Sequence, residues 1–192
     1  MACALKASLS WRHGRLSYQN STWNTSYACY ILPILRLLGN YTCGISMILH
    51  DVLNKVVISS ELAPAKAYEV DLAINALSET TSQDLLLFDR NFPSYKFLAI
   101  LTQKSRQFVM RCSKSSFSTA RELFQQDHID SRRVTLTPAH DIKEEIKALG
   151  LPNEIEVRFV ALRLPTGELE VLVTSLLCSS GISYQRIWGD LP

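Results

Sequence analysis

The sequence has few of the residues that mark disulfide-rich, metal-binding or disordered proteins. Five cysteines are scattered over 192 residues, and none of them belongs to a C-x-x-C pair. The four histidines do not fall at the spacings of zinc ligands either. Glycine and proline are scarce, with 7 of each, and no low-complexity tract or internal repeat is present, so disorder is not indicated. We therefore expect a globular chain with one sizeable core and reduced thiols in the cytoplasm.

No apolar run is long enough to cross a membrane. The best candidate, residues 27–38, is interrupted by Pro33 and Arg36, and it lies too far into the chain for a signal peptide. We interpret this segment as a short helix that is buried or faces a partner. The formal net charge of +2 permits contact with nucleic acid but does not by itself indicate it.

Residues 1–43 contain no aspartate and no glutamate. Aromatic and basic side chains alternate irregularly there, including Trp11, Arg12, Arg15 and Trp23. Such a mixture can stack on bases and contact phosphates. It can also be an ordinary surface segment, and the absence of any clear periodicity favours that second interpretation.

The most informative stretch is residues 84–111. Residues 85–88 form a short apolar run that predicts a buried strand, and the run ends at Asp89. Ser94 is suited to cap the helix predicted after it. A second apolar strand, residues 107–110, ends at Arg111. This order predicts a strand–helix–strand unit with two parallel strands.

A carboxylate at the carboxyl end of a buried strand lies where open α/β sheets bind ligands. Asp89 has that position in the predicted unit. A structural role is the alternative, because Asp89 could cap the following helix or pair with Arg90, and charged residues commonly end strands. The sequence pattern alone leaves both roles open.

At these residues the chain resembles a known family. The segment LLLFDRNFPSY, residues 85–95, followed by FVMR, residues 108–111, resembles the second-aspartate segment of bacterial insertion-sequence transposases of the DDE class. The branch is the IS-four-like one, which carries a β-strand insertion. Asn91 stands where the family has glycine, and asparagine tolerates the positive φ of a tight turn better than most residues.

Two further segments resemble the same family in the expected order. Residues 44–77 resemble its hairpin and following helix, and residues 157–177 resemble the hairpin before its last catalytic segment. Within the first match we interpret Asp51 as a turn residue and Glu69 as part of a solvated helix face. The resemblance covers roughly residues 44–177.

The resemblance implies a fold and a division of the chain. We expect an α/β, ribonuclease-H-like mixed sheet with helices, here incomplete, and a β-rich insertion at about residues 130–177. Residues 44–192 would be a partial transposase catalytic domain, and residues 1–43 a segment outside the match.

The resemblance also implies DNA transposition with Mg²⁺ as the cofactor. Two metal ions held by three acidic residues run strand cleavage and transfer in such enzymes, and Asp89 would be the second of the three, as catalytic residue and metal ligand. Arg90, Arg111 and Lys114 are then expected to contact DNA. Lys114 lies in a serine-rich loop, residues 112–116, which could contact phosphates or could be an ordinary solvated loop.

The other two acids of the family are not identifiable. The first should precede the hairpin, where residues 1–43 have no acid. The third should follow a Tyr-x-x-Arg-Trp pattern, which Tyr184, Arg186 and Trp188 only echo, and Asp190 does not match it. We therefore expect a truncated or frame-disrupted transposase that holds Mg²⁺ weakly and is catalytically incomplete.

Two other functional classes remain open. The chain could be a non-catalytic DNA-binding or dimerising fragment that interferes with a full-length transposase, or an unrelated α/β protein with an interaction role. The expected partners are DNA at transposon ends and another copy or a full-length transposase, with no membrane involved.

Overall fold

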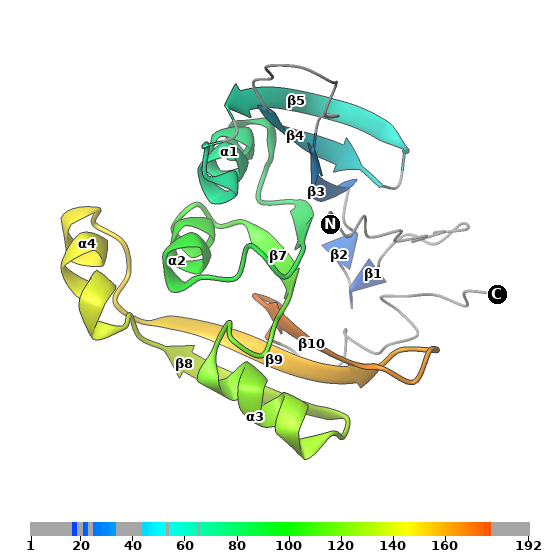
Figure 1. Ribbon diagram of the computed structural model, residues 1–192, viewed down its shortest axis with the longest axis vertical. Coiled ribbons are helices and arrows are strands. Elements are labelled where there is room, and N and C mark those ends of the chain that lie inside the picture. The colour runs from blue at the N-terminus through cyan, green and yellow to red at the C-terminus, as the bar shows by residue number, and fades with distance from the viewer. Residues whose placement is uncertain are drawn as a thin grey trace, which may run out of the picture.

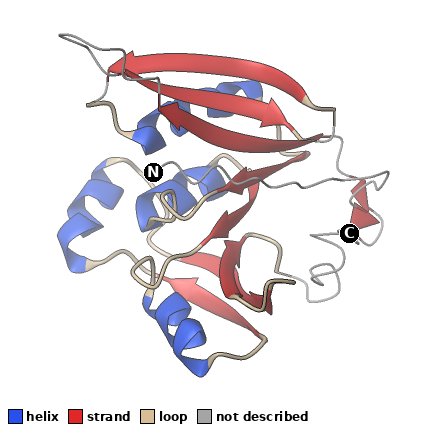
Figure 2. Ribbon diagram, turned by 45° about the vertical axis from the view of Figure 1, so that its right-hand side comes forward, coloured by secondary structure: helices blue, strands red, loops and turns tan. Residues whose placement is uncertain are grey.

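The computed structural model describes residues 17–18, 21–22, 25–33, 44–52, 54–64 and 66–177. Its main feature is an eight-stranded sheet in the order β5-β4-β3-β6-β7-β10-β9-β8, with helices packed on one face (Figures 1 and 2). The strands of this sheet are β3 (Thr25–Pro33), β4 (Gly44–Asp51), β5 (Val56–Pro64), β6 (Asp84–Phe88), β7 (Gln107–Arg111), β8 (Asp130–Leu136), β9 (Ile155–Arg163) and β10 (Leu169–Thr174). Two short strands, β1 (Ser17–Tyr18) and β2 (Ser21–Thr22), pair separately. The helices are α1 (Glu69–Ala76), α2 (Tyr95–Gln103), α3 (Ser118–Gln126) and α4 (Lys143–Ala148), with 3-10 turns at Leu77–Glu79 and His140–Ile142.

Five of these strands form the mixed part of the sheet. β3, β4 and β5 are antiparallel neighbours, whereas β6 runs parallel to β3 and β7 runs parallel to β6. The parallel pair β6–β7 is connected through α2, so the predicted strand–helix–strand unit is confirmed. The expectation of a mixed α/β sheet is confirmed as well.

The prediction of a helix within residues 27–38 is wrong for residues 27–33. These residues belong to β3, which is hydrogen-bonded to β4 on one side and to β6 on the other. A short apolar run does not distinguish a buried helix from a buried strand, and two neighbouring strands decide the outcome here. β3 is also an interior strand, third from one edge, of a sheet that we predicted to be incomplete. The division at residue 44 remains a prediction, although the sheet itself extends across it.

The first turn of α2 begins as the sequence predicts. Ser94 has an extended backbone, and its side chain accepts a hydrogen bond from the Phe97 backbone N–H at 3.3 Å. Within the first turn of the helix, the Phe97 ring packs edge-on against Phe88, with 5.0 Å between the ring centres, and also contacts Phe92. These three rings tie β6, the loop after it and α2 into the main core, which also receives side chains from α1, α3 and α4.

Two predicted turns are confirmed in detail. Asp51 ends β4 and its carboxylate accepts hydrogen bonds from the backbone and side-chain N–H groups of Asn54, so it is a turn residue. β9 and β10 form the second hairpin, in which Gly167 has a φ of 86° that a residue with a side chain rarely adopts. The loop of this hairpin therefore requires its glycine.

The second half of the sheet continues from β7. β10 pairs antiparallel with β7, β9 with β10 and β8 with β9, so the expected β-rich region becomes an extension of the same sheet. A smaller apolar cluster, made by Leu85, Val109, Leu162 and Leu172, lies apart from the main core. Within the described residues, no helix is long and apolar enough to span a membrane.

Replacing Phe97 tests the importance of the aromatic contacts. Phe97 is fully buried, so Phe97→Ala should lower the free energy of unfolding by about 3–5 kcal/mol through lost contacts and a cavity. Urea denaturation followed by circular dichroism measures this loss. Tyr68→Ala, at an exposed site, is the control and should change stability by about 0.5 kcal/mol or less. Equal effects of the two substitutions would contradict the packing described here.

Candidate functional site

Asp89 lies directly after β6, which is an interior strand between β3 and β7. Its side chain is 19% exposed, so the carboxylate is largely covered but still reaches solvent. The predicted place of Asp89, at the carboxyl end of an interior strand, is therefore confirmed. Its roles in catalysis and metal binding remain predictions.

The carboxylate of Asp89 is engaged by Arg111 at the end of β7. Arg111 Nη1 lies 3.3 Å from Asp89 Oδ1, and Arg111 Nη2 donates to Glu170 Oε2 at 2.7 Å. The Arg111 and Glu170 side chains are only 15% and 9% exposed. One guanidinium on β7 therefore holds two carboxylates from the segments on either side of it, one just after β6 and one in β10.

The two structural roles that the sequence left open for Asp89, pairing with Arg90 and capping the next helix, are weaker than its ion pair with Arg111 or absent. Arg90 Nε is 3.9 Å from Asp89 Oδ1, at the outer limit of an ion pair, and the Arg90 side chain is 48% exposed. Such a pair contributes little in solvent. The helix α2 is capped by Ser94 and not by Asp89. Pairing with Arg111, which sequence reasoning did not propose, is the main interaction.

Glu170 is the residue that sequence reasoning missed. It is the only acidic residue in β10, whose other residues up to Val173 are apolar, and it is buried. A lone acid in an apolar strand was the available signal, because buried carboxylates need a partner. That partner lies 59 residues away in the sequence.

Cys112 is the buried thiol beside this site. Burial, with a further contribution from the Glu170 carboxylate, raises the pKa of Cys112 to about 12. The thiol is therefore protonated at neutral pH, and a neutral thiol is a poor nucleophile and metal ligand. Cys112 contributes packing and not reactivity.

The described residues do not fit a magnesium site. No three His, Cys, Asp or Glu side chains within the described ranges lie close enough to hold a metal ion. β3 pairs with β6 as far as Ala28 and Leu87, and β3 contains no acidic residue. Arg111 already places a positive charge between the two nearby carboxylates, which opposes a divalent cation.

The three residues predicted to bind DNA have different environments. Arg90 is accessible, whereas Arg111 is enclosed by its two carboxylates. Lys114 is exposed on the turn after β7, and its ammonium lies 6.0 Å from the centre of the Phe124 ring. The structure thus brings Arg90 and Arg111 together at Asp89, and it leaves Lys114 on the neighbouring loop. Their binding of DNA remains a prediction.

The predicted lead-in to a third acid, Tyr184 to Asp190, lies outside the described residues. So do Trp11, Arg12, Arg15 and Trp23.

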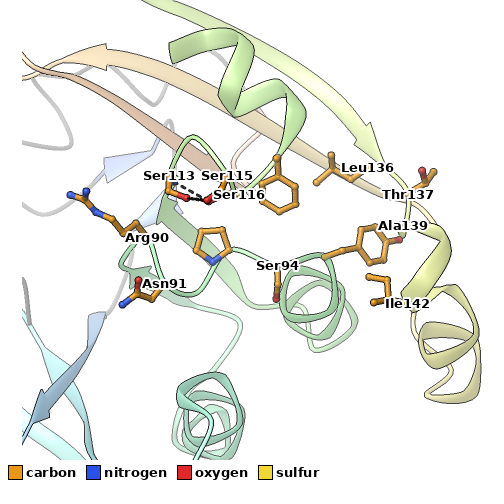
Figure 3. A pocket seen from close by; sticks show the side chains of 13 residues that line it. Arg90, Asn91, Ser94, Ser113, Ser115, Ser116, Leu136, Thr137, Ala139 and Ile142 are labelled. Carbon is orange, nitrogen blue, oxygen red and sulfur yellow. Dashed lines mark hydrogen bonds between the residues drawn. The ribbon is translucent and has the colours of Figure 1, made fainter. Parts of the chain in front are cut away.

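A cavity of about 610 Å³ opens beside Arg90. Figure 3 shows it between the loop after β6, the serine turn after β7 and the segment that follows β8. Its polar end is lined by Arg90, Asn91 and three serines, whereas Phe117 and Ile142 belong to its apolar wall. Loops at this edge of an α/β sheet commonly form ligand sites.

Comparison with known proteins gives limited similarity. No protein-family model matches the sequence, and no curated protein matches it. Among solved structures, the fold is similar to the piggyBac transposase in a synaptic complex with hairpin DNA, with a TM-score of 0.48 and 10% sequence identity. That similarity covers 85% of this chain and 35% of the transposase, so this chain spans about a third of that protein.

The fold is also similar to endonuclease V of Ciona intestinalis, in complex with DNA that contains an inosine followed by a ribo-adenosine. The TM-score is 0.33 and the identity 12%, over 80% of this chain and 72% of the endonuclease.

Removing Arg111 tests the ion-pair arrangement. Arg111→Met should lower the free energy of unfolding by about 2–4 kcal/mol, because Asp89 and Glu170 would be left as neighbouring, largely buried charges. Adding Glu170→Gln to that variant should recover part of the loss, since one uncompensated charge is removed. Chemical denaturation measures both effects.

The control for this experiment is Arg121→Met, because Arg121 is exposed on α3. It should cost about 0.5 kcal/mol or less. If Arg111→Met were equally mild, the two carboxylates would not depend on the guanidinium.

Proposed function

We propose that this protein is a transposase-like, ribonuclease-H-like protein that binds DNA without completing metal-dependent strand cleavage. The observation that carries this proposal is the environment of Asp89. The residue stands at the carboxyl end of an interior strand, where the resemblance requires a catalytic aspartate, yet its partner is the Arg111 guanidinium.

The order of the strands supports the fold part of the proposal. The segments that resemble the transposase family fall on β4 and β5, on the β6–α2–β7 unit and on the β9–β10 hairpin. They lie in one sheet, with β3 between β4 and β6. β3 supplies the strand that such a sheet needs next to β6.

The chemistry of the site supports binding over cleavage. Hydrolysis or transfer of a phosphodiester by this class of centre needs metal ions that activate the attacking oxygen and stabilise the leaving one. The described residues offer Asp89 and Glu170, and both are already paired with Arg111. The neighbouring strand β3 contains no acidic residue and so adds no further carboxylate. The positive charges near this site that a phosphate can reach are those of the accessible side chains Arg90 and Lys114.

A binding and cleavage experiment tests this proposal. The purified chain should bind duplexes taken from either side of its own coding region, and the affinity should fall as salt rises. Arg90→Gln combined with Lys114→Gln should reduce the slope of log affinity against log salt by about two, one for each lost phosphate contact. Gel-shift titrations at several salt concentrations measure the slope.

The controls separate binding from catalysis. Lys104→Gln removes one exposed charge at the far end of α2, and it should leave the slope unchanged. No strand cleavage should occur with Mg²⁺ or Mn²⁺. Metal-dependent cleavage that disappears in Asp89→Ala would refute the incomplete centre, and failure to bind any DNA would refute the DNA part.

A dimerising fragment is the second candidate, and the edge strand β5 favours it. Among the described strands, β5 pairs only with β4, and it exposes Val57, Ile58 and Leu62, the last at 69%. Antiparallel pairing of two copies centred on Ser60 would place Ile58 opposite Leu62 of the second copy. Exposed apolar edges of this kind invite pairing with another chain.

Leu62→Lys tests that candidate, because a lysine on an edge strand disfavours pairing. The wild type should form dimers at micromolar concentrations, and Leu62→Lys should be monomeric at the same concentrations. Analytical ultracentrifugation measures both. Tyr68→Lys, also at an exposed site, should still dimerise. A wild type that is monomeric throughout would exclude dimerisation through β5.

A further inference from the structure

The cavity beside Arg90 has a lining suited to an anion. Of the residues that line it, none is acidic. Its polar end is lined by Arg90, Asn91 and the serines Ser113, Ser115 and Ser116, and Figure 3 shows the Arg90 and Asn91 side chains pointing outward, away from the serine hydroxyls. An anion at this end would meet the serine hydroxyls without a competing carboxylate in the wall, and the half-exposed Arg90 side chain would have to turn inward to reach it.

The three serine hydroxyls keep a donor for a ligand. Ser113 Oγ lies 2.9 Å from Ser115 Oγ and 2.9 Å from Ser116 Oγ. Ser116 Oγ also accepts the Ser113 backbone N–H at 2.9 Å. Three hydroxyls carry three protons, and the two contacts between them use two. At least one proton is therefore free to point at an anion in the cavity.

Arg90 is the side chain with the most freedom to bind such an anion. Its Nε is 3.9 Å from Asp89 Oδ1, while Arg111 approaches the same oxygen at 3.3 Å. Asp89 therefore depends mainly on Arg111, and the half-exposed Arg90 guanidinium keeps most of its donors. A phosphate, with several acceptor oxygens, matches this fork better than a neutral group does.

The rest of the lining is largely apolar and includes Pro93, Phe117, Leu136 and Ile142, together with the polar groups of Ser94, Tyr95 and Thr137. A volume of about 610 Å³ lies within the usual range of small-molecule sites, roughly 300–1,000 Å³, and exceeds the needs of a lone phosphate. The first turns of α2 and α3, which contain no acidic residue, begin at this part of the lining and add to the positive potential.

We propose that this cavity binds a nucleotide by its terminal phosphate. The phosphate monoester would occupy the end formed by Arg90 and the serine turn, and the sugar and base would lie against Pro93 and Phe117. The nucleotide is either the end of a DNA strand or a free mononucleotide. The first of these sources rests on the DNA binding proposed above.

Oligonucleotides that differ only at their ends test this site. One single-stranded sequence is prepared with a phosphate at its 5′ end, at its 3′ end or at neither, and its affinity for the full chain is measured by fluorescence anisotropy. A phosphorylated form should bind about tenfold more tightly, the effect of a charge-assisted hydrogen bond. Arg90→Gln and Ser115→Ala should each reduce this preference, whereas Lys104→Gln should preserve it.

The ratio of affinities distinguishes this site from general charge attraction, because loss of charge elsewhere weakens all three oligonucleotides together. Equal binding of the three forms would overturn the inference and leave the proposed function intact. A preference that survives both Arg90→Gln and Ser115→Ala would also overturn it.

Deoxynucleoside monophosphates provide the second arm, measured by calorimetry on the same variants. The wild type could bind a mononucleotide, lose that binding in Arg90→Gln and bind no oligonucleotide. This result would uphold the site and refute the proposed DNA function. Neither ligand binding would refute both.

Discussion

The Arg111 guanidinium between Asp89 and Glu170 is the interaction on which the described site depends. It joins the end of β6 to β7 and β10, which are neighbours in the sheet only because β10 docks antiparallel on β7. Taking three charged groups out of water is costly unless each has a partner in good geometry. Here the Arg111 guanidinium pairs with both carboxylates. These three charged groups together determine the electrostatic environment of any ligand bound at this edge.

This arrangement has a chemical consequence. A centre for phosphodiester cleavage needs carboxylates that are free to coordinate cations. At this edge the positive charge is built into the chain, and it cannot leave or exchange as a metal ion can. Any attraction for phosphate at this edge comes from Arg90 and the serine turn, which add donors without adding acids. The proposed function, recognition of DNA without its hydrolysis, rests on that difference.

Several elements could be predicted from the sequence because their signals are local. The apolar run of β6, the capping serine of α2 and the glycine of the β9–β10 loop each act within a few residues. The strand β3 was not predicted, since residues 25–33 have no clean periodicity. It is extended because β4 and β6 bind it on both sides. Glu170 was missed for a similar reason, as its partner Arg111 is distant in the chain.

The sequence alone determined that residues 1–43 carry no acid, and hence that any strand formed there brings no carboxylate to the centre of the sheet. It also determined which residues end the buried strands. The tertiary structure decided that β3 lies beside β6 and that Arg111, not Arg90, is the main partner of Asp89. The reason is physical: the type of each residue is a local property, whereas pairing of charges across strands depends on a register that the whole sheet fixes.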